Sequence, residues 1–170
     1  MSVTDVRTDP IALTITVTSE WRAPIERVWE LWADPRKLER WWGPPSHPAT
    51  VFEHDLRPGG TVAYYMTGPE GDKTYLWWNI VEVDEPHRLV ATDGGWADTD
   101  AAGQPNQPVE DGGPSGMVVT LAALPSGVTS MIIEMRFPSS EELQQMIDMD
   151  MAEGIAIAVG QIADILGVAV

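Results

Sequence analysis

The chain has 170 residues, with 26 acidic and 10 basic side chains and a formal net charge of −16, so it lacks the clustered positive charge that nucleic acids and anionic membranes attract. It contains no cysteine, which excludes disulfides, thiolate metal sites and cysteine catalysis. The N-terminus has no basic start, and Gln161 and Asp164 interrupt the C-terminal apolar stretch, so we expect no signal peptide, no membrane insertion and a cytoplasmic location.

The first predicted element is a strand over residues 11–21, in which isoleucine, leucine and valine alternate with alanine and threonine. Residues 1–10 are expected to be a flexible N-terminus. The length predicts a single domain, placed over residues 11–166, and residues 167–170 are left as a short C-terminal tail.

Two short helices are predicted next. In the first, apolar side chains recur at helical spacing from Ile25 to Trp32, after a proline at position 24 that suits a first helical turn. The second covers residues 35–42 and also begins with a proline. Residues 43–48 contain three prolines and are predicted to be a rigid extended loop.

These two helices hold four of the eight tryptophans of the chain. Trp29 and Trp32 are interpreted as core residues, because large aromatic side chains dominate ordinary cores. Trp41 and Trp42 stand beside the proline-rich loop, and they belong either to the core or to the wall or entrance of a cavity.

Further strands are predicted where short runs rich in β-branched and aromatic residues lie between Gly, Pro and Asp turns. These strands cover about residues 50–57, 61–67, 73–83, 87–93, 117–123 and 128–137. Residues 93–116 show no periodicity, and a loop of this length in a compact domain is usually functional. We expect it to form a flap near a pocket mouth, with Trp96 turned toward the cavity.

The last predicted element is a long helix. Ser139 and Glu142 match a capping box, and apolar side chains then recur at helical spacing to about Leu166, where Gly167 provides a stop. The inner stripe consists of Leu143, Met146, Ile147, Met151, Ile155, Ala158, Ile162 and Ile165. This order predicts an α+β fold, a curved antiparallel sheet of six to seven strands wrapped around a long C-terminal helix.

Several segments resemble the helix-grip superfamily of START-like and polyketide-cyclase-like proteins (SRPBCC), and within it the single-domain relatives of the activator of heat-shock-protein-90 ATPase. They are APIERVWELWADPRKLERWWGP, HDLRPGGTVAYYMTGPEGD, VDEPHRLVATDGGWADTDAAGQP, VTLAALPSGVTSMIIEMRFPS and MDMAEGIAIAVGQIADIL. The resemblance implies a cavity between sheet and helix that commonly holds a hydrophobic or aromatic molecule. The family also tends to carry a tryptophan where this chain has Ile155, directly after Gly154.

Strand alternation assigns side chains to the inner face of the sheet, since residues two apart point the same way. Together with the tryptophans and the helix methionines, it gives a set of candidate cavity residues. They are Trp32, Trp41, Phe52, His54, Tyr64, Met66, Tyr75, Trp77, Asn79, Trp96, Met117, Met135, Met146 and Met149. A lining rich in Trp and Met suits a flat or apolar ligand better than a polar metabolite.

Polar residues on this predicted inner face have two interpretations. His54, Tyr64, Tyr75 and Asn79 either hydrogen-bond one another within the core or orient a ligand in an apolar pocket. His54 is a weak candidate for an acid–base catalyst, with Tyr64 or Tyr75 as its partner. It has no visible nucleophile or metal partner, so we expect no catalytic residue.

The sequence carries no recognisable metal or cofactor motif. It has no HExxH, no nucleophile elbow and no phosphate loop, and the calcium-like run that begins at Asp98 lacks oxygen ligands at Ala102 and Val109. We therefore expect no metal and no cofactor. The leading hypothesis is binding of a hydrophobic small molecule; the alternatives are a cyclase- or hydrolase-type enzyme and a cochaperone-like interaction module. A homodimer is also plausible, because tryptophan-bearing surfaces often associate.

Overall fold

The computed structural model describes residues 2–98 and 116–167, and for residues 93–98 it describes the backbone only. Eight strands of this part of the chain form one antiparallel sheet in the order β1-β2-β8-β7-β6-β5-β4-β3. The strands are β1 (Val3–Asp9), β2 (Thr14–Trp21), β3 (Ala49–His54), β4 (Thr61–Thr67), β5 (Lys73–Asp84), β6 (Arg88–Asp98), β7 (Gly116–Leu124) and β8 (Val128–Arg136). The helices are α1 (Ile25–Ala33), α2 (Pro35–Trp41), α3 (Ser140–Asp148), α4 (Met151–Gly160) and α5 (Ile162–Leu166), with a 3-10 turn η1 (Pro125–Gly127) between β7 and β8.

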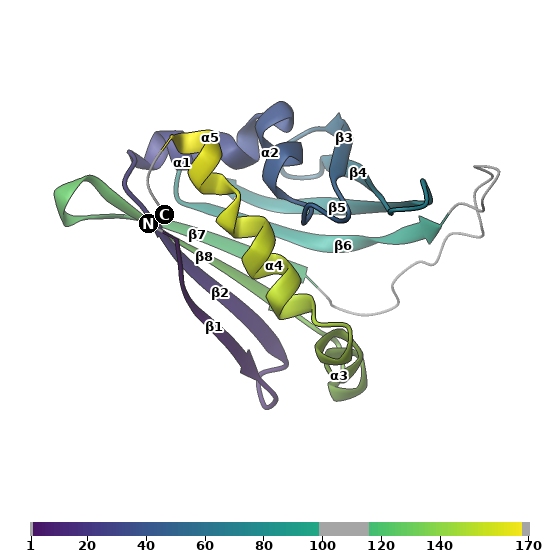
Figure 1. Cartoon of the computed structure of the whole chain (residues 1–170). Coiled ribbons are helices and arrows are strands. Elements are labelled where there is room, and N and C mark those ends of the chain that lie inside the picture. Colours follow the sequence, from purple (N-terminus) through teal and green to yellow (C-terminus); the bar gives the residue numbers. More distant parts are fainter. Residues whose placement is uncertain (1, 99–115, 168–170) are drawn as a thin grey trace.

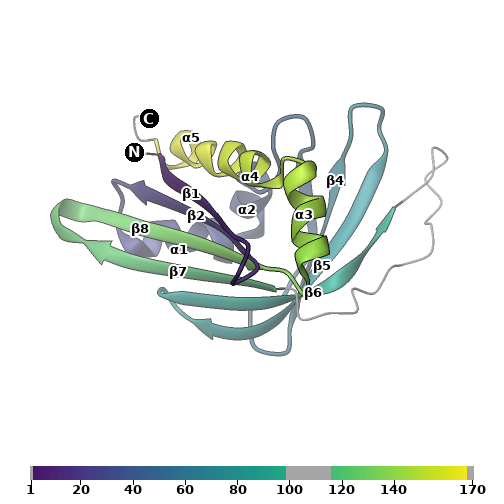
Figure 2. The ribbon, with the colours of Figure 1, turned by 90° about the horizontal axis from the view of Figure 1, so that it is seen from below.

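The sheet is curved and does not close, since β1 and β3 both remain edge strands. In Figure 2 the half made of β1, β2, β7 and β8 stands at an angle to the β4–β5 hairpin, and α4 and α5 lie on one side of the sheet. Figure 1 shows α4 crossing in front of β7 and β8. The predicted α+β helix-grip arrangement is therefore confirmed.

The strand predictions match the structure most closely at β4, β5 and β8 and depart from it most at β6. Strand β6 continues to Asp98, and its backbone stays paired with β5 as far as that residue. The predicted loop therefore begins later than residue 93. The side chain of Trp96 and residues 99–115 lie outside the described residues, so the flap remains a prediction.

Strand β1 occupies residues that we expected to be a flexible N-terminus. It pairs antiparallel with β2 at the edge of the sheet, and most of its side chains are exposed. Because neither face is buried, its sequence VTDVRTD carries no apolar alternation from which a strand would be predicted. The predicted start at residue 11 is also wrong, since residues 10–13 form the turn and β2 begins at Thr14.

The carboxylate of Asp9 closes the turn between β1 and β2. Its Oδ1 accepts hydrogen bonds from the backbone N–H groups of Ile11 and Ala12, both at 2.9 Å. The bond from Ala12, followed by that from Ile11, lowers the pKa of the Asp9 carboxyl from its ordinary value of 3.8.

This shift predicts an acid-sensitive hairpin. A depressed folded-state pKa means that the stabilisation by Asp9 is complete above pH 3.8 and is lost as the pH falls through the lower value of the folded protein. An NMR titration of the Asp9 carboxyl carbon should give a midpoint below that of unfolded aspartate, and Asp9→Ala should remove this part of the acid dependence. A midpoint at or above the ordinary value would contradict the turn geometry.

Helices α1 and α2 lie within a residue or two of their predicted positions. The buried side of α1 consists of Ile25, Val28, Trp29, Leu31 and Trp32. Asp34 ends α1 and caps α2, because its side chain accepts a hydrogen bond from the backbone N–H of Arg36 at 2.9 Å. The core interpretation of Trp29 and Trp32 is confirmed, since only 3% and 0% of their surfaces are exposed.

The C-terminal helix is not continuous, contrary to the prediction. Ser139 caps α3 as expected, accepting a hydrogen bond from the N–H of Glu142 at 3.1 Å, but α3 ends at Asp148. Asp150 then adopts a left-handed conformation with φ 55°, and the chain turns before α4 begins. Figure 2 shows α3 running across the direction of α4. Gly167 provides the predicted stop, with φ 69°.

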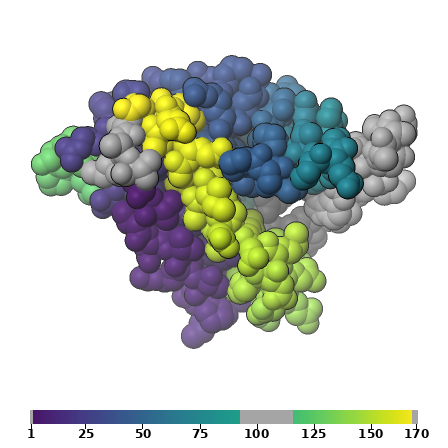
Figure 3. Space-filling view, in the orientation of Figure 1, coloured from purple at the N-terminus to yellow at the C-terminus, as the bar shows by residue number. Residues whose placement is uncertain are grey.

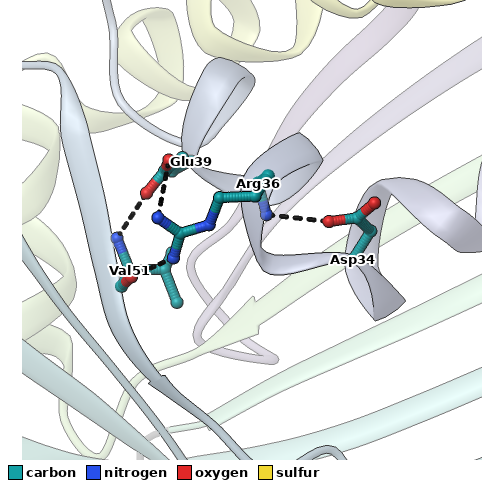
Figure 4. A network of polar contacts seen from close by, with 4 residues as sticks. All are labelled: Asp34, Arg36, Glu39 and Val51. Carbon is teal, nitrogen blue, oxygen red and sulfur yellow. Dashed lines mark hydrogen bonds and ion pairs between the residues drawn. The ribbon is translucent and has the colours of Figure 1, made fainter.

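Helix α2 is fixed to the edge strand β3 by a small polar network (Figure 4). The guanidinium of Arg36 donates to the carbonyl oxygen of Val51, and the N–H of Val51 donates to Glu39 at 3.0 Å. Arg36 and Glu39 also form an ion pair at 3.2 Å. The network therefore satisfies backbone groups that an edge strand would otherwise leave open to pairing with another chain.

Replacing Glu39 with Ala should lower the free energy of unfolding by about 1–2 kcal/mol, because the Val51 N–H loses its acceptor and Arg36 its partner. Urea unfolding followed by circular dichroism measures this loss. The control is Lys37→Ala, which breaks an ion pair with Glu30 on the exposed side of the helices and should cost less than about 0.5 kcal/mol. Equal losses in the two variants would show that the strand contact contributes nothing.

Candidate functional site

The candidate site is a pocket of about 410 Å³ between the sheet and the C-terminal helices. Its lining comes from the end of α2 and the loop after it, from β4, β5 and β8, and from α3 and α4. The lining residues are Trp41, Trp42, Pro44, His47, Tyr64, Met66, Leu76, Met135, Met146, Met149, Asp150, Met151, Gly154, Ile155 and Ala158. Figure 3 shows α3, α4 and the blue segment that includes α2 on the same face of the molecule.

One wall of the pocket belongs to a cluster of packed aromatic rings. Trp42 lies at the centre of this cluster, with its ring centroid 5.5 Å from that of Trp41, 4.9 Å from that of Trp78 and 6.3 Å from that of Tyr64. All three pairs are nearly perpendicular, a geometry that aromatic rings favour. Trp32 closes the cluster from behind, with its centroid 4.8 Å from Trp41. The wall is therefore rigid and preformed.

The indole N–H groups of the cluster differ in whether they have a hydrogen-bond acceptor. Trp41 donates to the carbonyl oxygen of Leu31 at 3.0 Å, and Trp32 donates to the sulfur of Met131 at 3.4 Å. The N–H of Trp42 is buried and has no acceptor, the one such side-chain group among the described residues. An unpaired buried donor lowers the stability of a folded protein by about 1–3 kcal/mol. Trp42 therefore contributes an aromatic ring to the pocket wall and lowers the stability of the protein at the same time.

Methionines and small residues form much of the rest of the lining. Met146, Met149 and Met151 come from α3, α4 and the turn between them, while Met66 and Met135 come from the sheet. Methionine side chains are flexible and adapt to irregular shapes. This part of the lining can therefore adjust to what the pocket holds.

Few polar groups line the pocket. His47 lies in the exposed loop after α2, where its Nδ1 is 2.9 Å from the Ser46 hydroxyl oxygen. Asp150 lies in the exposed turn between α3 and α4, and its side chain makes no capping bond to α4. Tyr64 is buried in the wall of the pocket. The two charged or titratable groups at the rim thus stand at its solvent side.

Six of the predicted cavity residues line this pocket: Trp41, Tyr64, Met66, Met135, Met146 and Met149. Trp32 and Met117 are buried in the core but are not part of the lining. Phe52, His54, Tyr75, Trp77 and Asn79 do not line it either. The side chain of Trp96 is outside the described residues.

A β-bulge explains why Phe52 was placed on the wrong face. The pairing of β3 with β4 shifts between Val51 and Glu53, so the alternation breaks at this residue. Val51 points into the core with 1% exposure, and Phe52 points outward with 56% exposure. His54 is on the inner side, as predicted, but its Nε2 lies 2.9 Å from the carbonyl oxygen of Trp32. It therefore has the partner expected of a polar group within the core.

A second bulge inverts the prediction for β5. The pairing with β6 shifts between Ile80 and Glu82, which makes Val81 the additional residue. Trp78 and Ile80 are consequently buried, while Asn79 and Val81 are exposed. Tyr75 and Trp77, predicted to face inward, are on the outer side with Asn79. Tyr75 packs there against Phe52, with ring centroids 5.9 Å apart.

The lining also contains residues outside the candidate set: Trp42, Pro44, His47, Leu76, Asp150, Met151, Gly154, Ile155 and Ala158. Met151, Ile155 and Ala158 fall on the predicted inner stripe of the C-terminal helix, and that stripe was the signal for them. Leu76 shares a face with Trp78, so recognising the bulge identifies it. Pro44 and His47 come from a loop without periodicity, and no pattern in the sequence indicates them.

Two further features concern the described residues alone. Within residues 2–92 and 116–167, no three His, Asp or Glu side chains lie close enough together to hold a metal ion. In the same part of the chain, every helix is too short or too polar to cross a bilayer.

Comparisons with known proteins place the chain in a family. The model of the Activator of Hsp90 ATPase homolog 1-like protein family matches residues 22–167. Protein Ms6760 from Mycobacterium smegmatis is 45% identical, with a TM-score of 0.81 over 97% of this chain and 98% of that one. A protein from Arthrobacter aurescens is 40% identical, with a TM-score of 0.85 over 98% and 92% of the two chains.

A more distant structure, CalU16 from Micromonospora echinospora, is 22% identical, with a TM-score of 0.51 over 91% of this chain and 82% of that one, and it shows the fold alone. No curated protein matches the sequence. The resemblance inferred from the sequence is confirmed by the family match. The chain belongs to the Activator of Hsp90 ATPase homolog 1-like protein family.

Proposed function

We propose that this protein binds an apolar, preferably aromatic, small molecule in the pocket between the tryptophan cluster and α3–α4. The observation that carries the proposal is the pocket itself, about 410 Å³ of space bordered by aromatic rings and five methionines. Ligand pockets typically have volumes of about 300–1,000 Å³ and are lined mainly by apolar side chains with a few polar groups. A molecule of two or three rings matches this space.

The packing around the pocket supports the same proposal. The aromatic cluster is closely packed, and Trp32 and Trp41 are fully buried. The pocket therefore does not arise from a loose core, because the tryptophans that border it are packed against one another. A space of this kind loses contacts unless a guest supplies them, so an apolar ligand gains favourable burial on entering.

An acid–base mechanism receives no support from the residues considered for it. His54 bonds to a backbone carbonyl oxygen and Tyr75 lies on the outer face of the sheet, so neither reaches the pocket with Tyr64. A general acid or base must come within hydrogen-bond reach of the reacting group. Binding is therefore the function that the site supports best.

Titration with N-phenyl-1-naphthylamine, an uncharged three-ring fluorophore, tests the proposal. Its emission should rise on addition of the protein, tryptophan emission should fall, and the melting temperature should increase with ligand concentration, because a ligand that binds only the folded state stabilises it. Glucose, which is polar and of similar mass to small aromatic ligands, is the negative control. If the fluorophore and a panel of related aromatic compounds all leave the three signals unchanged, the pocket is not a binding site.

A further inference from the structure

The C-terminal wall of the pocket carries negative charge only. After Arg136 the sequence contains no lysine and no arginine up to its last residue. The same stretch contains the acidic residues Glu141, Glu142, Asp148, Asp150, Glu153 and Asp164. Three of these, Asp148, Asp150 and Glu153, lie within the turn between α3 and α4 or directly beside it. This turn provides Met149, Asp150 and Met151 to the pocket.

Asp150 is a lining residue with an unusual backbone conformation. Its φ of 55° and ψ of 36° are left-handed, a conformation that Asp and Asn tolerate better than most residues. The backbone is held on both sides, since the N–H of Asp150 donates to Ile147 at 3.0 Å and its carbonyl oxygen accepts from the N–H of Gly154 at 3.0 Å. The carboxylate is exposed and does not cap α4.

The start of α4 is the one feature of this wall that favours an anion, because unpaired N–H groups give a helix N-terminus a partial positive charge. Asp150 occupies the N-cap position, and Glu153 lies in the first turn. Their two negative charges outweigh a partial charge of about half a unit. The wall therefore remains negative.

Among the described residues, neither lysine nor arginine lines the pocket, and His47 is the one basic residue at its rim. On the elements that line the pocket, Arg136 pairs with Glu134 at 2.7 Å, Arg36 with Glu39 and Lys37 with Glu30, and Lys73 lies 4.5 Å from the ring centroid of Tyr65. Arg40, in the last turn of α2, is exposed and is not part of the lining. Residues 99–115 contain neither lysine nor arginine, so they bring no positive charge to any position.

We infer that the pocket accepts uncharged and cationic apolar molecules and discriminates against anions such as fatty acids, with Asp150 as the main determinant. This inference rests on the proposed function, since it specifies the charge of the ligand that the pocket takes. The apolar body of a ligand lies against the tryptophans and methionines, and a polar head group lies at the rim beside the Asp150 carboxylate. An anionic head meets a like charge there at short range, in a protein whose net charge is −16.

Three ligands with the same ten-carbon chain separate charge from apolar burial: decanol, decylamine and decanoate. Each is used to displace N-phenyl-1-naphthylamine at about pH 8, where the amine head group carries a positive charge and the carboxylate a negative one. Decanol and decylamine should displace the fluorophore, and decanoate should need an about tenfold higher concentration. This difference in concentration between decanoate and decanol should become smaller with added salt, because the rim is exposed to solvent and salt screens its charge.

Two variants identify the carboxylate responsible. Asp150→Asn keeps the shape and the left-handed backbone but removes the charge. The affinity for decanoate should therefore rise most of the way to that for decanol, while the affinity for decanol stays the same. Asp164→Asn changes the net charge of the protein by the same amount, but Asp164 lies in α5 and is not part of the pocket lining. This variant should keep the difference in affinity between decanol and decanoate. Circular dichroism verifies that both variants fold.

The outcomes separate the two proposals. If the fluorophore binds and decanoate displaces it as well as decanol does, charge discrimination is wrong and the binding function stands. If both variants reduce the difference in affinity between decanol and decanoate equally, the net charge of the protein causes this difference, and Asp150 is not its main determinant. If the fluorophore does not bind at all, the proposed function fails, and this inference fails with it.

Discussion

Replacing Gly154 with Phe should weaken binding of N-phenyl-1-naphthylamine at least about tenfold while leaving the fold intact. Gly154 lies in α4 and lines the pocket, and a Cβ atom built at this position meets no atom within 4 Å beyond its chain neighbours and the nearby backbone of its own helix. A phenyl ring placed here therefore extends into the space that the ligand needs. Phenylalanine is also a better helix former than glycine, by about 0.5 kcal/mol, so stability should not fall.

Gly160→Phe is the matched control for this experiment. Gly160 lies in the same helix and a Cβ there also meets nothing within 4 Å, but this residue is not part of the pocket lining. The fluorophore should bind the Gly160 variant like the unchanged protein. Equal binding to all three proteins would mean that the ligand lies elsewhere.

Trp32→Ala should lower the free energy of unfolding by about 3–5 kcal/mol, a large share of the 5–15 kcal/mol that is usual for a domain. The Trp32 side chain is fully buried, and its ring lies within 6.2 Å of those of Trp41, Trp42 and Trp78, centroid to centroid. Its removal leaves a cavity behind the pocket wall and an unpaired sulfur at Met131. Urea unfolding followed by far-ultraviolet circular dichroism measures the loss, and Trp32→Phe provides a milder variant if the alanine variant does not fold.

Phe52→Ala, by contrast, should lower the free energy of unfolding only slightly, although Phe52 is also a large aromatic residue. Phe52 is 56% exposed and contacts only Tyr65 and Tyr75 among the aromatic rings of the described residues, so its removal should cost less than about 1 kcal/mol. Strand alternation alone assigns it to the cavity, where the cost would be several times larger. A loss at Phe52 as great as that at Trp32 would contradict the bulge in β3.

The elements that the sequence predicts well are those fixed by local chemistry. The helical spacing of the apolar residues in α1, the cap at Asp34 and the stop at Gly167 each act within a few residues. Six of the cavity candidates also line the pocket, and four of them, Tyr64, Met66, Met135 and Met146, lie on faces that periodicity identifies correctly.

The errors in the site arise where a single backbone irregularity changes the face of everything beyond it. One additional residue in β5, at Val81, places Tyr75 and Trp77 on the outer side and Leu76 at the pocket. Bulges depend on how two strands pair, and a strand's own sequence does not specify its partner's register. The turn at Asp150 is hidden in the same way, because its left-handed backbone interrupts a helical pattern that continues through it.

Methionine methyl NMR tests the central claim most directly, since the chain contains eight methionines and the pocket is lined by five of them. In protein labelled with carbon-13 at the methionine methyl groups, addition of N-phenyl-1-naphthylamine should shift the signals of Met66, Met135, Met146, Met149 and Met151. Met117 and Met131 are buried outside the lining and should shift little. Unmoved signals from the five pocket methionines at saturating ligand would contradict the account.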